Sequence, residues 1–279
     1  MDGSFILFFC SRGIYRAFLR SYDNKGVFMR KILIAISFFT RFPIKLKDVS
    51  EEEFYDSMIF MPLVGLLVGA ILFAVSWVLS YIHVIQLQAL FTMIVYIWIT
   101  GGLHLDGFAD TVDALFSARD HAKMMEIMKD SRLGSFGAIG LILLFLTIWS
   151  CYTVILPENL LILILMPVIG RYCAIQTCCF STYAEGGGGL GRRIVEMTKP
   201  WHVLLYLVLI LPFAWFAIGP VAFFAALGTM VINLGLMLYL QHKIGGITGD
   251  TIGLTIELTQ TIFLVVLAVI QANWILLAA

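Results

Sequence analysis

Seven long apolar tracts constrain the fold of this chain more than any other feature of its sequence. A helix rises 1.5 Å per residue, so roughly 17 to 25 apolar residues cross the hydrocarbon core of a bilayer. Tracts of this length run over about 62–80, 87–103, 135–156, 160–180, 202–218, 221–240 and 256–277. The sequence therefore predicts an all-α, polytopic membrane protein with about seven transmembrane helices.

Composition supports this fold class. Apolar residues make up 61% of the chain and charged residues only 13%, with a mean hydropathy of +0.96, whereas soluble domains have about a quarter charged residues. The net charge of zero gives no reason to expect nucleic acid as a partner. We expect one transmembrane domain over 29–279. Residues 1–28 form an extension of unknown role, either an interfacial segment or sequence upstream of an alternative start at Met29.

Basic residues concentrate near the N-terminus, which predicts the orientation in the membrane. Nine of the 18 Lys and Arg precede residue 48, and cytoplasmic flanks attract Lys and Arg. With seven spans, the loops near 104–134, 181–201 and 241–255 then also face the cytoplasm. We therefore expect a multi-pass protein of the cell (inner) membrane with its active site at the cytoplasmic membrane edge.

The segment 104–137 places acidic and basic side chains between two nearly uncharged tracts. Asp106, Asp110 and Asp113 follow the spacing i, i+4, i+7, so a helix would present all three on one face, and the helical pattern continues to about Met128. Oxygen donors of this kind suit Mg²⁺ or Mn²⁺. A solvated juxtamembrane face is the alternative interpretation.

The flanks of this acidic run add candidates for substrate binding. Lys129 and Arg132 carry the opposite charge beside Gly134 and could hold phosphate oxygens. Asp130 is a fourth candidate metal ligand, unless Asp130 and Arg132 simply neutralise each other. His104, two residues before Asp106, is a candidate for substrate contact.

Two further loops carry candidate residues. Four glycines at 186–189 precede Arg192 and could form an anion-binding nest or a hinge. Asp250 and Glu257 are seven residues apart, two helical turns on one face, and are candidates for a second metal or substrate element. Arg171 lies inside an apolar tract, where it either pairs with a carboxylate or marks a functional site.

Four motifs occur in order along the chain: FFTRFPI at 38–44, GGLHLDGFADTVDALFSAR at 101–119, IMKDSRLGSFG at 127–137 and GGITGDTIGLTIE at 245–257. From about Met29 to the C-terminus the chain closely resembles the adenosylcobinamide-GDP ribazoletransferase (cobalamin synthase) family. The glycine run at 186–189 is longer than the family's usual stretch.

The resemblance implies a membrane enzyme that joins adenosylcobinamide-GDP to α-ribazole or its 5′-phosphate and releases GMP, with Mg²⁺ as cofactor. Applied to these residues, it implies that Asp106, Asp110 and Asp113 hold Mg²⁺. Lys129, Arg132 and Arg192 would bind the phosphates, and Asp250 or Glu257 would complete the metal site or accept a proton.

Two other functions and one structural question stay open at this point. A CDP-alcohol phosphotransferase also uses a spaced aspartate run, but its Gly-x3-Asp-x3-Asp tail does not follow Asp113 here. A cation-coupled transporter would place its carboxylates near the bilayer midplane. Gly65 and Gly69 allow close helix approach, either within one chain or between copies in a homo-oligomer.

Overall fold

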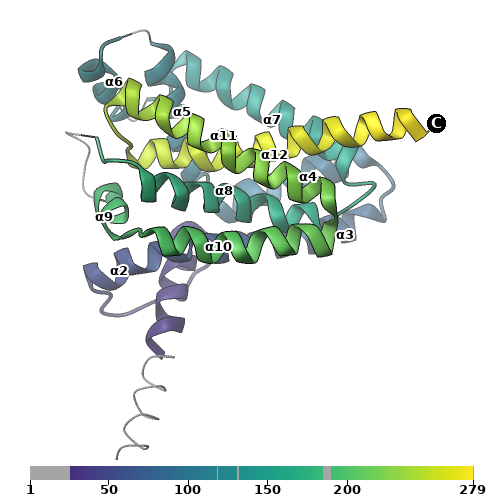
Figure 1. The fold of residues 1–279 in the computed structure, drawn as a ribbon, viewed down its shortest axis with the longest axis horizontal. Helices are drawn as coiled ribbons and strands as arrows, with labels where there is room; N and C mark the ends of the chain where they lie inside the picture. Colours follow the sequence, from purple (N-terminus) through teal and green to yellow (C-terminus); the bar gives the residue numbers. More distant parts are fainter. Residues whose placement is uncertain (1–25, 118, 131, 185–189, 279) are drawn as a thin grey trace, which may run out of the picture.

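The computed structural model describes residues 26–117, 119–130, 132–184 and 190–278 of the chain. These residues form a helical bundle, with one isolated bridge between Tyr183 and Ile247 as the only β-type pairing among them. The extension predicted at 1–28 lies almost wholly outside the described residues. Figure 1 shows α2, α6 and α9 gathered at one end of the bundle and the C-terminus at the opposite end.

Six helices are long and apolar enough to cross a membrane, and a bent pair supplies the seventh crossing. This confirms the predicted all-α polytopic class with about seven spans. The six are α3 (Met61–Ser80, preceded by α2, Glu51–Ser57, and the 3₁₀ turn η1, Met58–Phe60), α7 (Ser135–Ile155), α8 (Ile162–Phe180), α10 (Pro200–Phe213, continued by the π-helical turn η2, Ala214–Ile218), α11 (Pro220–Ile244) and α12 (Gly249–Ala278).

The bent pair consists of α4 (Ile85–Thr100) and α5 (Leu103–Phe116), whose axes differ by 93°. Gly101 and Gly102 form the corner with φ of 67° and 76°, a left-handed backbone that glycine adopts without steric cost. The second span therefore ends at Thr100, before the predicted edge at 103. The acidic helix α5 lies crosswise at the end of α4 and is not itself a span.

Two further predicted boundaries differ from the structure. The single helical pattern expected from Asp106 to Met128 is two helices, because α5 ends at Phe116 and α6 (His121–Met128) starts after Asp120, whose side chain caps Lys123 N at 2.9 Å. The last span starts at Gly249, seven residues before the predicted 256. Asp250 therefore lies on the first turn of α12 and not in a loop.

Besides α2, two helical segments of the bundle had no counterpart among the predicted tracts. Residues 26–39 are helical and bury Ile34, Ala35 and Phe39 against the bundle. Helix α9 (Leu190–Met197) is only two turns long. Both segments are too short or too charged to stand out as apolar tracts, and tertiary packing stabilises such helices more than their own propensity.

Helix α8 forms the centre of the bundle and is the most buried of the spans. It packs against α3 through two small residues. A Cβ added at Gly65 would lie 2.6 Å from the Pro167 carbonyl oxygen, and one added at Gly69 would lie 2.6 Å from the Ile164 Cα. Close packing within the chain is thus confirmed as the role of Gly65 and Gly69.

Candidate active site at the crossing of α5 and α12

The acidic helix α5 crosses the first turns of α12 at a glycine contact. A Cβ at Gly253 would lie 2.9 Å from the His104 carbonyl oxygen and 3.3 Å from the Gly107 Cα. A Cβ at Gly107 would lie 2.9 Å from the Asp250 Cα. Because neither glycine has a side chain, the two backbones touch, and Asp250 is placed beside the aspartates of α5.

Three carboxylates converge at this crossing: Asp106 is exposed, whereas Asp110 and Asp250 are half-buried. Partial burial, and then the negative charges of Asp106, Asp250, Asp113 and Asp130, raise the pKa of Asp110 to about 6. Each carboxylate disfavours ionisation of its neighbours. The site therefore concentrates negative charge that a cation would neutralise.

Asp113 has a different environment, although it shares the face of α5. It is buried, and its carboxylate accepts hydrogen bonds from Gly134 N at 2.8 Å and Gly137 N at 2.9 Å. These amides belong to the N-cap and first turn of α7, where N–H groups have no partner within the helix. Asp113 thus caps α7 from another helix and fixes the angle between α5 and α7.

Asp130 and Arg132 pair with each other at the surface. The Arg132 guanidinium donates to both Asp130 oxygens, with Nη2 at 2.5 Å from Oδ2. Hydrogen bonds from Arg132 lower the pKa of Asp130 to about 2. The mutual neutralisation considered from the sequence is therefore present. The charge of Asp130 acts on Asp110, but its carboxylate is held by Arg132. Lys129 is exposed at the C-cap of α6.

A polar cleft of about 590 Å³ lies between α5, α6 and the start of α7. Its walls include Asp113, Asp130 and three basic side chains, Arg119, Lys123 and Arg132. Arg119 and Lys123 were not predicted as site residues, because a basic side chain outside a span usually lies in solvent without a specific ligand. The break between α5 and α6 turns both residues toward the cleft that also receives Arg132, and three cations there suit phosphate oxygens.

Glu257 and His104 lie in a buried polar centre and not with the three carboxylates. Glu257 is fully buried and accepts hydrogen bonds from Tyr96 Oη at 2.6 Å and Gln260 Nε2 at 2.5 Å. Seven residues of helix put it about 10 Å from Asp250 along α12. His104 is 5% exposed, and its ring nitrogens have no hydrogen-bond partner among the described residues.

Arg171 belongs to the same buried centre. Its side chain is completely buried; Nη1 donates to the Pro167 carbonyl oxygen at 3.2 Å, and Nε and Nη2 have no partner within the described part of the chain. The electrostatic partners of Arg171 are Glu257, Tyr96 and His104. The four groups come from α4, α5, α8 and α12, so this centre joins the crosswise helix α5 to the spans.

Tyr183 and the start of α9 lie near the first turn of α12. The glycines of the run at 186–189 lie outside the described residues. Arg192 is exposed on α9, and a Cβ at its neighbour Gly191 would lie 3.2 Å from Gly249 N, next to Asp250. Burial and then the charge of Asp250 raise the pKa of Tyr183. Arg192 is thus near the start of α12.

The donor set decides which metal the site suits. Within the described ranges no three His, Cys, Asp or Glu side chains are close enough to enclose a metal ion by themselves. Mg²⁺ usually keeps several waters and binds through one or two carboxylates plus substrate phosphates. The partly exposed oxygens of Asp106, Asp110 and Asp250 therefore fit Mg²⁺ bound together with a phosphorylated substrate.

Comparison with known proteins shows the family of this chain. Residues 31–268 match the family model described as cobalamin-5-phosphate synthase. Curated proteins named adenosylcobinamide-GDP ribazoletransferase are 35% identical in Clostridium acetobutylicum (243 residues; 85% of this chain, 95% of the relative) and in Fusobacterium nucleatum (278 residues; 88% and 100%). No solved structure matches the chain.

The family match covers the segments that build the site. It includes α5, α6, the start of α7, α9 and the first turns of α12, which together hold the acidic cluster and the basic cleft. With the seven crossings and the relatives above, these matches identify the chain as a member of the cobalamin-5-phosphate synthase family, a membrane transferase of cobalamin synthesis.

Proposed function

We propose that this chain transfers the adenosylcobinamide-phosphate moiety of adenosylcobinamide-GDP to α-ribazole or its 5′-phosphate, with release of GMP and a requirement for Mg²⁺. The observation that supports this most is the convergence of Asp106, Asp110 and Asp250 at the glycine crossing of α5 and α12. Phosphoryl transfer needs in-line positioning and neutralisation of phosphate charge, and a carboxylate-bound cation beside a basic cleft supplies both.

In the proposed reaction a ribose hydroxyl of α-ribazole attacks the phosphorus atom that carries the corrinoid arm. A new P–O bond forms, the P–O bond to GMP breaks, and the hydroxyl proton is released. Bound Mg²⁺ would neutralise charge on the diphosphate. Asp106 and Asp110 would hold the ion, and Asp250 would complete the site and receive the proton.

The basic residues around the site would hold the leaving diphosphate. Arg119, Lys123 and Arg132 line the cleft beside Asp113, and Arg192 approaches from α9. Lys129 belongs to the same loop. In this assignment Asp113 and Glu257 do not contact the metal or the substrates, and they position helices instead. Asp113 positions α7, and Glu257 anchors α12 two turns below Asp250.

We further propose that the acidic site faces the cytoplasm of the cell (inner) membrane. All segments with candidate residues start or end at the end of the bundle that carries α2, α6 and α9 (Figure 1), and half of the Lys and Arg precede residue 48. This agrees with the bias of Lys and Arg toward the cytoplasm. Reporter fusions test it: a fusion at Lys243 should report a cytoplasmic position.

The function is tested with purified protein, adenosylcobinamide-GDP, α-ribazole and Mg²⁺, following GMP release. Wild-type protein should release GMP only when both substrates and Mg²⁺ are present. Asp106→Asn should lower turnover at least about 100-fold, because it removes a charged oxygen from the site. The matched control is Glu158→Gln, which changes an exposed carboxylate in the turn between α7 and α8 and should keep normal turnover.

Two results would contradict the proposal. Folded wild-type protein that releases no GMP would exclude the reaction itself. Full activity of Asp106→Asn would remove Asp106 from the site and leave the reaction to other residues.

A further inference from the structure

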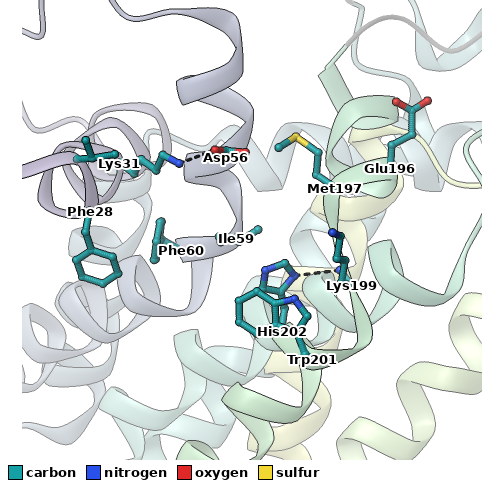
Figure 2. Close-up of a pocket in the computed structure, with 11 residues that line it drawn as sticks. Phe28, Lys31, Asp56, Ile59, Phe60, Glu196, Met197, Lys199, Trp201 and His202 are labelled. Carbon is teal, nitrogen blue, oxygen red and sulfur yellow. Dashed lines mark hydrogen bonds and ion pairs between the residues drawn. The ribbon is translucent and has the colours of Figure 1, made fainter. Parts of the chain in front are cut away.

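A second cavity of about 590 Å³ lies between the helix of residues 26–39, η1 and the junction of α9 with α10 (Figure 2). Volumes of 300 to 1,000 Å³ are typical of small-molecule pockets. None of the three converging aspartates lines it. We infer that this pocket receives the benzimidazole base of α-ribazole, an inference that rests on the proposed function and names where one of its two substrates binds.

The walls of the pocket suit a flat aromatic ring. Figure 2 shows Phe28 and Phe60 on one side and Met197 on the other, with Trp201 and His202 together below them. The Phe28 and Phe60 rings meet edge to face at 5.2 Å, and the Trp201 and His202 centroids are 3.8 Å apart. Aromatic faces and a thioether contact planar rings favourably.

The charges around the pocket favour a neutral group. Lys31 and Asp56 form an ion pair at 2.5 Å on one wall, and Lys199 and Glu196 lie on the other. Two positive and two negative side chains give a formal sum of zero. A phosphate or other anionic group gains little in such a pocket, whereas the uncharged base of α-ribazole carries no penalty there.

His202 offers a specific contact for this base. Its Nδ1 accepts a hydrogen bond from Lys199 N at 3.0 Å, so in the neutral ring the proton resides on Nε2. An unsubstituted ring nitrogen of a benzimidazole riboside is a hydrogen-bond acceptor, and this base has no donor.

Helix α9 connects the pocket to the acidic site. Its start at Gly191 contacts the beginning of α12 next to Asp250, and Met197 at its other end lines the pocket. Six residues of helix separate these points by about 9 Å. This is comparable to the long dimension of a benzimidazole riboside, and in this inference the ribose of a base held here extends along α9 toward the carboxylates. A corrin ring with its side chains is too large for the cavity.

The test is a variant whose larger side chain fills the pocket, with the KM measured separately for each of the two substrates. In the full-length enzyme, Met197→Trp should raise the KM for α-ribazole about tenfold or more. The KM for adenosylcobinamide-GDP, and kcat at saturating α-ribazole, should stay within about twofold, because the second substrate and the reacting groups bind elsewhere. The matched control is Leu204→Trp, an exposed position of α10 outside the pocket.

A second variant and a binding measurement keep the test independent of folding and turnover. Phe28→Ala changes a half-exposed wall residue and should also raise the KM for α-ribazole selectively. Equilibrium dialysis of α-ribazole with the Asp106→Asn protein measures binding without reaction. Binding should be retained in Asp106→Asn and lost when Met197→Trp is added.

The outcomes separate the inference from the proposed function. If wild-type protein releases GMP but Met197→Trp and Phe28→Ala leave the KM for α-ribazole unchanged, the inference is overturned and the function stands. If no GMP is released, pocket-dependent binding of α-ribazole still supports the inference, and its absence overturns it. A phospholipid that copurifies with wild type and is lost in Met197→Trp, with unchanged α-ribazole binding, would assign the pocket to lipid and overturn it as well.

Discussion

Gly107 of α5 passes so close to Asp250 of α12 that a Cβ at position 107 would lie 2.9 Å from both the Cα and the carbonyl oxygen of Asp250. The two residues are far apart in the sequence, yet this contact brings Asp250 to Asp106 and Asp110. The position of the acidic cluster thus depends on the absence of two side chains, those of Gly107 and Gly253.

Gly253→Ala should therefore damage the site more than the fold. The new methyl group would meet the His104 carbonyl oxygen at 2.9 Å and push α5 away from α12, at a cost of about 1–3 kcal/mol. We expect GMP release to fall at least about tenfold while membrane insertion is retained. Gly228→Ala and Gly235→Ala are the controls, because a Cβ at either position of α11 meets nothing within 4 Å. Unchanged activity of Gly253→Ala would show that the crossing tolerates separation.

Substitution of Asp113 should separate a structural role from a metal role. Asn at this position keeps one oxygen but places an amide N–H₂ against Gly134 N or Gly137 N, and a lost buried hydrogen bond costs about 1–3 kcal/mol. Thermal unfolding in detergent should shift downward, whereas the Mg²⁺ concentration for half-maximal activity should stay within about twofold. A large rise in that Mg²⁺ concentration would instead make Asp113 a metal ligand, as the sequence predicted.

Neutralisation of Asp110 should stabilise the metal-free protein. Its pKa in the folded state is raised to about 6, above the ordinary 3.8. The ionised carboxylate therefore destabilises the folded state. This destabilisation is complete above about pH 6 and is absent below the pKa of the unfolded state. In EDTA at pH 8, Asp110→Asn should gain about 1 kcal/mol after solvent screening is allowed for, or about 2–4 °C in Tm. The gain should be roughly half as large at pH 5.

The same Asp110→Asn protein should lose transferase activity, because the neutral amide cannot replace a charged ligand. A lower Tm at pH 8 without metal would contradict the repulsion described at this site.

Arg171 and Glu257 should show strong coupling in a double-mutant cycle. Both side chains are completely buried, and removal of one partner leaves an uncompensated charge, typically at a cost of 3–5 kcal/mol. We expect Arg171→Met and Glu257→Gln each to lower thermal stability more than the double variant does. Additive losses in the double variant would show that the two charges do not compensate each other.

Several features of the fold follow directly from the sequence. The apolar tracts predicted the crossings within a few residues, apart from the start of α12, because the length of a span is fixed by bilayer thickness. The pattern of Asp106, Asp110 and Asp113 predicted a shared helical face, and α5 has that face. Family motifs in the printed sequence indicated the transferase family, and the comparisons confirmed it.

Other features could not be read from local patterns. The spacing predicted the same role for Asp106, Asp110 and Asp113. In the structure the backbone N–H groups of Gly134 and Gly137 donate hydrogen bonds to the carboxylate of Asp113. Asp250 and Glu257 looked like a pair, but one lies at the helix start and the other deep among Tyr96 and Gln260. The pocket of Met197 and His202 joins segments that no motif connects.

The sequence alone thus determined the membrane class, the approximate spans and the supply of charged side chains, because hydrophobic length and helical periodicity are local properties. Only the tertiary structure decided which charges meet. The bend at Gly101 and Gly102 uses a left-handed backbone that glycine adopts, whereas the crossing at Gly107 and Gly253 arises where two backbones touch without side chains. Such contacts join residues far apart in the chain, and no local pattern encodes their partner.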